Sequence, residues 1–215
     1  MKFVVSYSGG KDSVLALHKM IKQGHTPIGL LVMINRDLKR SWFHGIDEEL
    51  LNNISQSLQI PLILCESGSE EYHTAMEDAL KKAKDMGAEA AVFGDIDIEG
   101  HRQWCQDRCK KADIKCIHPL WKCDREKNTE EIISLGYKCV IKCVNNSALP
   151  QDFLGKVLDN EIVSQMKSRG IDVCGENGEY HTIVLAGPIF SFPIEHVCKE
   201  VLDFGTVSAI NICAE

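Results

Sequence analysis

The residues best placed to do chemistry lie near the start of the chain, in the segment Ser8–Ser13, which reads SGGKDS. It follows the apolar run Phe3-Val4-Val5 and precedes Val14-Leu15-Ala16-Leu17, so we expect a strand, a tight turn and then a helix. The start of a helix leaves backbone N–H groups unpaired at its positive end, and glycines let a phosphate approach them closely. The segment therefore predicts a loop that grips pyrophosphate, formed by Ser8, Gly9, Gly10, Lys11, Asp12 and Ser13.

Two better-known phosphate motifs do not fit this segment. A Walker A loop would need a four-residue spacer before its Gly-Lys pair, and a dinucleotide fingerprint would need GxGxxG. A pair of glycines between a strand and a helix can also be a simple turn. The order of strand, glycines, charged residues and apolar helix favours the phosphate site.

The composition is that of an ordinary globular protein, with 215 residues, 44% hydrophobic and 26% charged. Its formal net charge of -7, from 24 basic and 31 acidic residues, argues against a broad nucleic-acid surface. The apolar start of the chain ends at Ser6, too soon for a signal peptide or a membrane span. We therefore expect a cytoplasmic protein.

The ten cysteines show no CxxC pair of the kind that is usual for structural zinc. Cys105 and Cys109 are one helical turn apart, and Cys139 and Cys143 repeat that spacing. In a reducing compartment most such residues act as small apolar side chains. The simplest prediction is thiols without metal, and whether any of them binds zinc stays open to elemental analysis.

Apolar runs alternate with amphipathic ones over the first 120 residues. Continuously apolar strands separated by helices indicate a parallel sheet covered on both faces, an α/β sandwich of Rossmann-like type. The expected strands cover residues 3–5, 27–34, 61–65 and 90–93, and the expected helices cover 14–22, 47–58 and 70–86.

Ligands of such sheets collect at the carboxyl ends of the strands. Gly94 and Asp95 follow the fourth expected strand, so we expect both near a ligand. Magnesium prefers carboxylates together with phosphate oxygens. Asp12 and Asp95 are therefore the predicted neighbours of a magnesium ion.

From residue 121 the pattern indicates a smaller, appended α+β domain, so the predicted domains are 1–120 for ATP binding and 121–215 for the acceptor substrate. Helices are expected at 128–135 and 159–169, and strands at 139–141, 183–186 and 209–213. The segment from Glu195 is expected to form a helix or strand before the last strand. That last strand could pair within the chain or with a second copy, which leaves a homodimer open.

A second unusual cluster runs from Asp172 to Thr182, and we expect it to be a loop. It combines glycines with Glu176, Asn177, Glu179, His181 and Thr182, which offer hydrogen-bond donors, acceptors and one group that titrates near neutrality. It predicts a site for a polar substrate, although a solvated turn has a similar composition. His181 is the candidate base and Glu176 or Glu179 the candidate orienting group.

The segment SGGKDS resembles the signature of the PP-loop ATP pyrophosphatases. Four further strings resemble the diphthine ammonia ligase family and occur in its order: FGDI from Phe93, PLW from Pro119, GENGEYHT from Gly175 and GPIF from Gly187. The resemblance implies an ATP-dependent ligase that adenylates a carboxylate, releases pyrophosphate and lets ammonia displace AMP. Its implied partners are ATP with magnesium, ammonia and a carboxylate acceptor, in the family a modified histidine on a translation elongation factor.

The resemblance also implies roles for particular residues. Lys11, Asp12, Glu176 and His181 would be catalytic. The nucleotide would also be bordered by Gly94, Asp95, Arg102 and the Phe43-His44 pair. The acceptor would be bound by Gly175, Glu176, Asn177, Gly178, Glu179, Tyr180, His181 and Thr182.

The segment Asp97–Cys109 resembles a branch of the family with bacterial members, and bacteria make no diphthamide. The acceptor therefore stays open. Two other readings remain: a PP-loop enzyme that modifies tRNA or transfers sulfur, and a non-catalytic regulator that binds adenine nucleotides. The acidic charge and the missing CxxC pair weigh against the first of these.

Overall fold

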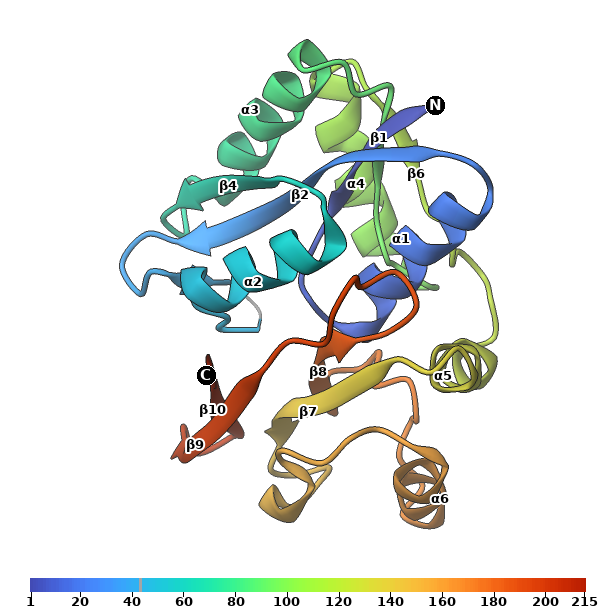
Figure 1. The fold of residues 1–215 in the computed structure, drawn as a ribbon, viewed down its shortest axis with the longest axis vertical. Helices are drawn as coiled ribbons and strands as arrows, with labels where there is room; N and C mark the ends of the chain where they lie inside the picture. Colours follow the sequence, from blue (N-terminus) through green and yellow to red (C-terminus); the bar gives the residue numbers. More distant parts are fainter. Residues whose placement is uncertain (43) are drawn as a thin grey trace.

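The computed structural model describes residues 1–42 and 44–215, which form two sheets stacked one above the other (Figure 1). Sheet A is mainly parallel, with strand order β3-β2-β1-β5-β6. A sixth strand, β4, also pairs with β2 but lies outside this order. Only the short β3 runs antiparallel. Its strands are β1 (Lys2–Ser6), β2 (Thr26–Asn35), β3 (Arg40–Ser41), β4 (Leu62–Ser67), β5 (Ala90–Val92) and β6 (Lys115–Ile117).

Helices cover both faces of sheet A because its strands are apolar on both sides. Val4 and Leu31 pack into one cluster with residues of α3 (Tyr72–Asp85) and α4 (Glu99–Lys111). The next residue along each strand points to the opposite face, where it packs with α1 (Lys11–Lys22) and α2 (Glu48–Leu58). The α/β fold class predicted from the sequence is confirmed.

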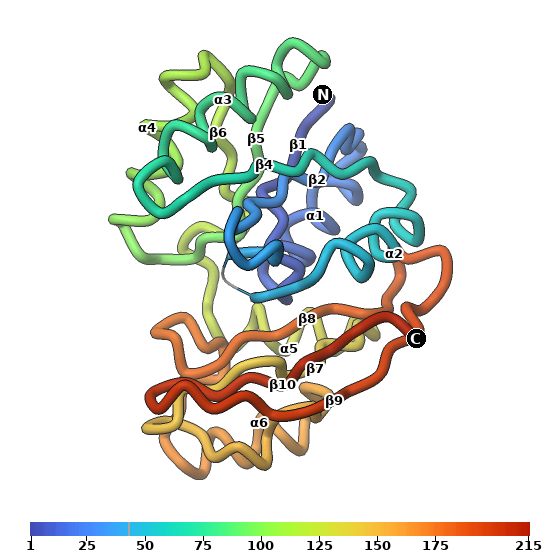
Figure 2. Tube along the Cα trace, turned by 90° about the vertical axis from the view of Figure 1, so that its left-hand side faces the viewer, coloured from blue at the N-terminus to red at the C-terminus, as the bar shows by residue number. Residues whose placement is uncertain are grey.

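Sheet B is antiparallel, with strand order β8-β7-β10-β9 (Figure 2). The last strand pairs within the chain, between β7 and β9, and β9 forms the edge. The elements of this half are α5 (Arg125–Ser134), β7 (Lys138–Asn145), a 3₁₀ turn (Gln151–Phe153), α6 (Asn160–Ser168), β8 (Tyr180–Ala186), β9 (His196–Asp203) and β10 (Val207–Ala214).

The two sheets share one hydrophobic core. Leu15 and Leu17 of α1 belong to the same buried cluster as Tyr137 and Ile183 of the second half. His18 Nδ1 also lies 2.8 Å from the hydroxyl of Tyr137. The predicted division at residue 120 stays a prediction, and the two sheets fall on either side of it.

Several sequence predictions differ from the structure. Strands β3 and β6 were not predicted. Helix α4 was not predicted either, because it buries only Cys105 and Cys109 and lacks a clear apolar stripe. The loop predicted to reach Thr182 was wrong, since strand β8 already begins at Tyr180. Alternation explains this, because Tyr180 and Thr182 are fully buried while His181 between them is only partly buried. The segment from Glu195, for which either a helix or a strand was expected, contains strand β9. Within the described residues, no helix is long and apolar enough to cross a membrane.

Candidate functional site

The glycine loop has the strand, turn and helix that its sequence predicts. Gly9 has φ +82°, and a Cβ there would lie 2.5 Å from Ile46 Cδ1. Gly10 precedes α1, and a Cβ there would lie 2.6 Å from His44 Cε1. Both positions therefore exclude a side chain, one by conformation and contact and the other by contact alone. The first turn of α1 follows this loop directly, and such a turn leaves amide N–H groups without a partner inside the helix, as an anion site requires.

Strand β8 binds the glycine loop directly. Val184 N donates to Gly9 O at 2.9 Å, and Lys11 N donates to Thr182 Oγ1 at 3.1 Å. The carbonyl of Thr182 accepts a hydrogen bond from His44 Nδ1 at 2.8 Å. Although the two sequence motifs lie 160 residues or more apart in the chain, they therefore form one continuous site. Thr182 joins them, because it belongs to the second motif and binds the first.

Lys11 and Asp12 form a close ion pair beneath this loop. Lys11 Nζ lies 2.7 Å from Asp12 Oδ2, and the ammonium also lies 5.7 Å from the centre of the Tyr180 ring. Burial by itself would lower the pKa of Lys11, but the Asp12 carboxylate outweighs it and holds that pKa well above its usual value. The side chain therefore stays charged at neutral pH and suits an anionic ligand.

Three titratable side chains near this pair have shifted pKa values. Burial, followed by the charge of Asp12, raises the pKa of Glu176 to about 7. Burial and the charge of Lys11 lower the pKa of His181. Burial and the neighbouring His181 lower the pKa of His44 to about 3, and the two imidazole rings lie 5.1 Å apart. Both histidines are therefore neutral at pH 7, whereas Glu176 is poised between its two forms.

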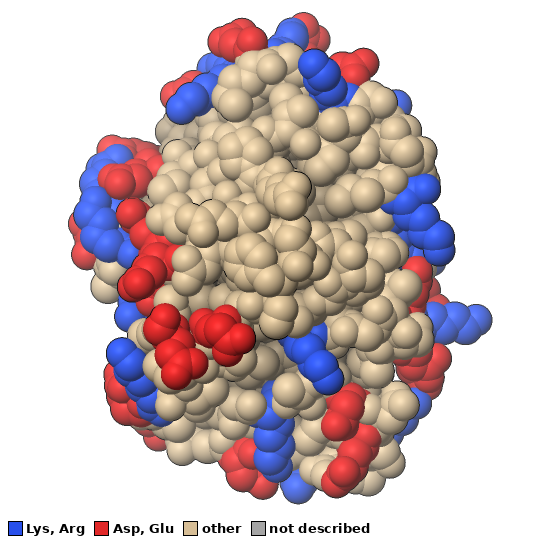
Figure 3. Space-filling model, in the orientation of Figure 1, with Lys and Arg blue, Asp and Glu red and all other residues tan. Residues whose placement is uncertain are grey.

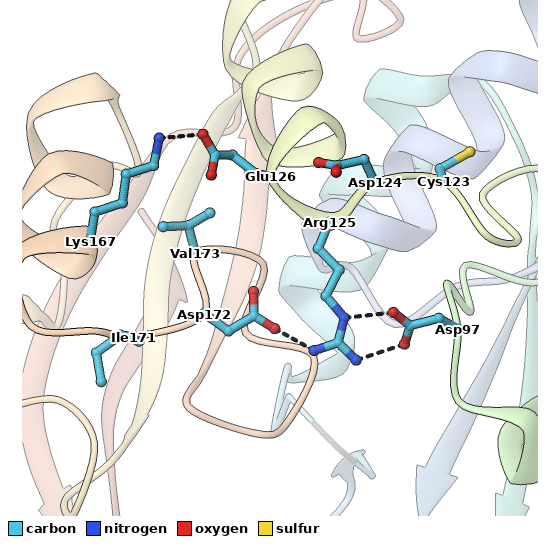
Figure 4. A pocket seen from close by; sticks show the side chains of 9 residues that line it. All are labelled: Asp97, Cys123, Asp124, Arg125, Glu126, Lys167, Ile171, Asp172 and Val173. Atoms are coloured by element: carbon cyan, nitrogen blue, oxygen red, sulfur yellow. Dashed lines mark hydrogen bonds and ion pairs between the residues drawn. The ribbon is translucent and has the colours of Figure 1, made fainter.

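The turn that carries Glu176 is held by Arg125, the first residue of α5. Its guanidinium contacts both oxygens of Asp97 at 2.6 and 2.7 Å, and one nitrogen lies 2.5 Å from Asp172 Oδ2 (Figure 4). The same nitrogen donates to Asn177 Oδ1 at 3.3 Å. Asp97 follows β5 and Asp172 belongs to the second half, so Arg125 links the two halves at the site. It also lines a cavity of about 460 Å³.

Other residues of the turn mainly stabilise it. Glu179 accepts hydrogen bonds from both the backbone and the side-chain amide of Asn177, at 3.1 Å each. Gly175 has φ +70°, and a Cβ there would lie 2.9 Å from the Tyr180 ring. Gly178 has φ +84°. The Tyr180 hydroxyl donates to Val173 O at 2.5 Å. Glu176 and His181 are therefore the members of this motif with an acid or base group not used in shaping the turn.

Gly94, Asp95 and Arg102 lie farther along the edge of sheet A. A Cβ on Gly94 would come within 2.9 Å of the Asp12 carbonyl carbon and the Ser13 amide, so this glycine makes room for α1 itself. Asp95 faces Cys105 and His118. Arg102 stacks on Trp121 at 4.7 Å and pairs with Glu99 at 3.6 Å. Within the described residues it makes no contact with the glycine loop, and Phe43 lies outside those residues.

Sequence reasoning missed Arg125, His118 and the thiol of Cys174, which lies 3.9 Å from Asp12 Oδ1. None of the three belongs to a spacing pattern that could have singled it out. Arg125 follows Asp124, which caps α5 by accepting from Lys127 N, so the pair resembles an ordinary helix start. Only the fold brings these side chains to the site.

Two family models cover most of the chain. The diphthamide synthase N-terminal domain matches residues 1–116, and the diphthamide synthase C-terminal domain matches residues 124–212. The chain belongs to the diphthamide synthase family. The resemblance predicted from the sequence motifs is thereby confirmed.

Relatives named diphthine–ammonia ligase match nearly the whole chain. The protein from Schizosaccharomyces pombe is 25% identical over 94% of this chain, but the chain covers only 37% of that protein. The human protein is 24% identical over 94% of this chain and 85% of its own length. A solved structure from Methanocaldococcus jannaschii, titled as a predicted subunit of a tRNA methyltransferase, matches 90% of this chain and 100% of its own at 17% identity with TM-score 0.47. A likeness this weak supports no further conclusion.

Proposed function

We propose that this protein is an ATP-dependent amide ligase that forms AMP and pyrophosphate. A carboxylate oxygen of the acceptor attacks the α-phosphorus of ATP, and the bond to the β-phosphate breaks. The nitrogen of ammonia then attacks the acyl carbon, AMP leaves with the oxygen, and one proton is released. The acceptor class is a carboxylate, with diphthine as the first candidate because the relatives are named for it.

One observation carries this proposal: the glycine loop and the GENGEYHT motif share hydrogen bonds. Lys11 N donates to Thr182 Oγ1, and Val184 N donates to Gly9 O. A nucleotide held by the first motif would therefore lie beside Glu176 and His181 of the second. That arrangement brings an acceptor into line with the phosphate by positioning alone.

We assign the stabilisation of the negative charge on the departing pyrophosphate to Lys11 Nζ and to the amides at the start of α1 other than that of Lys11, which binds Thr182. Lys11 is almost completely buried, and a charge in such surroundings acts more strongly than in water. Ser8, Gly9, Gly10 and Ser13 shape the loop, while His44 fixes Thr182 from behind. Asp95 and Arg102 would border the nucleotide from the α4 side.

The carboxylates present suit a magnesium ion that accompanies ATP. Burial, followed by the negative charge of Asp12, raises the pKa of Glu176, so the two carboxylates interact unfavourably. A divalent cation would relieve that repulsion, so Asp12 is its proposed ligand, with Asp95 as a second neighbour. When bound, magnesium would neutralise phosphate charge.

We assign the second step to His181 and Glu176. His181 is neutral at pH 7 because its pKa is lowered, so it can accept the proton that the attacking nitrogen must lose. Glu176, with a pKa of about 7, can orient that nitrogen in either protonation state. Glu179 supports the turn through Asn177.

The proposal is tested by incubating the full chain with ATP labelled at the α-phosphate, magnesium, ammonium and a diphthine-bearing acceptor. Labelled AMP and unlabelled pyrophosphate should form over repeated turnovers only when ammonium and the acceptor are both present. A Lys11→Ala variant is the control for contaminating activity. Production of ADP and phosphate under every condition would contradict the proposal.

The same assay separates the other candidate functions. A regulator would bind ATP and leave it intact with every acceptor. A tRNA-modifying enzyme would release pyrophosphate on addition of tRNA instead of a carboxylate protein. On the face drawn in Figure 3, Lys and Arg are scattered among Asp and Glu and form no broad basic surface, which favours the ligase.

A further inference from the structure

We propose that Asp95, Cys105 and His118 form a binding site for a divalent transition metal of the zinc class. Asp95 follows β5, Cys105 lies on the buried face of α4, and His118 follows β6. The three side chains therefore meet at the carboxyl edge of sheet A. One ligand atom from each lies within 4.8 Å of the other two.

Two of the three distances between the ligand atoms are close to those around a tetrahedral ion. Zinc binds sulfur, nitrogen and oxygen at about 2.0 to 2.3 Å, so two ligands of one tetrahedral zinc ion are separated by about 3.5 Å. Asp95 Oδ2 lies 3.5 Å from Cys105 Sγ and 3.6 Å from His118 Nε2. The metal would need only small side-chain shifts to bind all three.

The imidazole of His118 is buried, with its side chain only 6% exposed. Its Nε2 makes no hydrogen bond with any of the described residues, although Asp95 lies close by. An uncompensated buried nitrogen is costly, and coordination would satisfy it. The ring stacks on Phe93 at 5.5 Å and meets the edge of Trp121 at 6.0 Å, so its direction is fixed.

The other ring nitrogen of His118 also favours coordination. Nδ1 lies 3.8 Å from Cys116 Sγ, which can accept its hydrogen and leave the lone pair on Nε2. Metal-binding histidines usually donate their second N–H to an acceptor, most often a carboxylate, a carbonyl or water, and here a thiol sulfur lies in that position. Cys116 therefore supports the ligand without being one.

A mixed set of one sulfur, one nitrogen and one oxygen ligand selects zinc or a similar late first-row ion over magnesium. Three protein ligands leave a fourth position for water or a substrate atom. The side chain of Asp95 is 20% exposed, so the site can be reached from solvent. Asp95 Oδ2 is the oxygen that lies near Cys105 Sγ and His118 Nε2, whereas Oδ1 lies 3.8 Å from His101 Nδ1.

The test is the metal content of the full chain, expressed with added zinc, purified without chelator and dialysed. We expect about one zinc ion per chain in the unmodified protein and less than about a tenth of that in Cys105→Ala and His118→Ala. The matched control is Cys109→Ala, one turn along the same helix and equally buried, which should keep its zinc. Circular dichroism checks that each variant folds.

Cobalt(II) gives a second readout that needs no variant. Replacing zinc with cobalt in the unmodified protein should produce the near-ultraviolet charge-transfer absorption of a single thiolate ligand. Absence of both zinc and this absorption would overturn the proposal. Retention of zinc by both Cys105→Ala and His118→Ala, or loss of zinc only from Cys109→Ala, would overturn it equally.

Discussion

The two sides of the candidate site are held in place by different forces. The glycine loop is fixed largely through its backbone, by Val184 N on Gly9 O and by Thr182 on the Lys11 amide. The turn that carries Glu176 is fixed largely through charged side chains, above all Arg125 with Asp97 and Asp172.

This difference suggests that the two sides have different roles, the loop in binding ATP and the turn in binding the acceptor. Backbone contacts and crowding at Gly9 and Gly10 hold the loop in one conformation. A rigid loop suits the proposed ligand ATP, whose phosphates do not vary. Side-chain ion pairs between partly exposed residues can be broken at modest cost. A turn held in this way is therefore easier to rearrange than the loop.

The largest effect is expected from Lys11→Ala, which removes the buried charge on the loop side. Pyrophosphate release should fall by about 100-fold or more, because the charge of the leaving group loses its partner. Steady-state kinetics with saturating acceptor would measure this. Lys22→Ala, at the exposed end of the same helix, is the control and should leave the rate unchanged. A Lys11→Ala variant that changed only the KM for the acceptor would break the comparison.

A smaller effect is expected from Arg125→Lys on the turn side. Lysine keeps the charge but cannot contact both oxygens of Asp97 while it also binds Asp172. The KM for the acceptor should rise about tenfold, about 1.4 kcal/mol, while the Kd for ATP stays the same. Calorimetric ATP binding beside acceptor kinetics separates the two. Lys127→Ala on α5 is the control, and an equal loss of ATP affinity in Arg125→Lys would contradict this division of roles.

Thr182→Val tests the hydrogen bond that joins the two sides. Valine keeps the shape but leaves the Lys11 amide without its acceptor, so the free energy of unfolding should fall by about 1 to 2 kcal/mol. Urea denaturation measures this change. Thr182→Ser retains the hydroxyl and should recover most of the lost stability. If Thr182→Ser is destabilised as much as Thr182→Val, the two sides are joined by packing and not by the hydrogen bond.

The smallest effect is expected from Glu176→Gln and depends on pH. Since the pKa of Glu176 is raised from 4.5 to about 7, the folded state binds the proton more tightly, and stability falls as pH rises from about 4.5 to about 7. Partial exposure reduces this loss to about 1 kcal/mol. Glu176→Gln should remove this pH-dependent loss, so above pH 7 the free energy of unfolding of the variant should rise relative to that of the unmodified protein.

Denaturation at pH 5 and pH 8 gives the measurement. Glu49→Gln on the exposed face of α2 is the control for losing one negative charge. A stability difference between Glu176→Gln and the unmodified protein that is the same at both pH values would show that Glu176 does not titrate in this range.

Local patterns predicted much of the fold. Continuous apolar strands and amphipathic helices indicated the parallel sheet, and the strand, glycines and helix around Ser8–Ser13 have the predicted order. Helix α4 was missed because its buried face is made of two cysteines, and Tyr180–Thr182 was misread because glycines directly before it suggested a longer loop.

By itself, the sequence determined the glycine loop, the parallel sheet and the family, because each depends on residues that are neighbours along the chain. The tertiary structure alone decided that Thr182 binds the Lys11 amide, that Arg125 holds the turn of Glu176 and that Asp95, Cys105 and His118 meet. The physical reason is that a hydrogen bond, an ion pair or a metal site depends on distances of a few ångströms. Those distances are set by how the sheets and helices pack, which residue spacing does not encode.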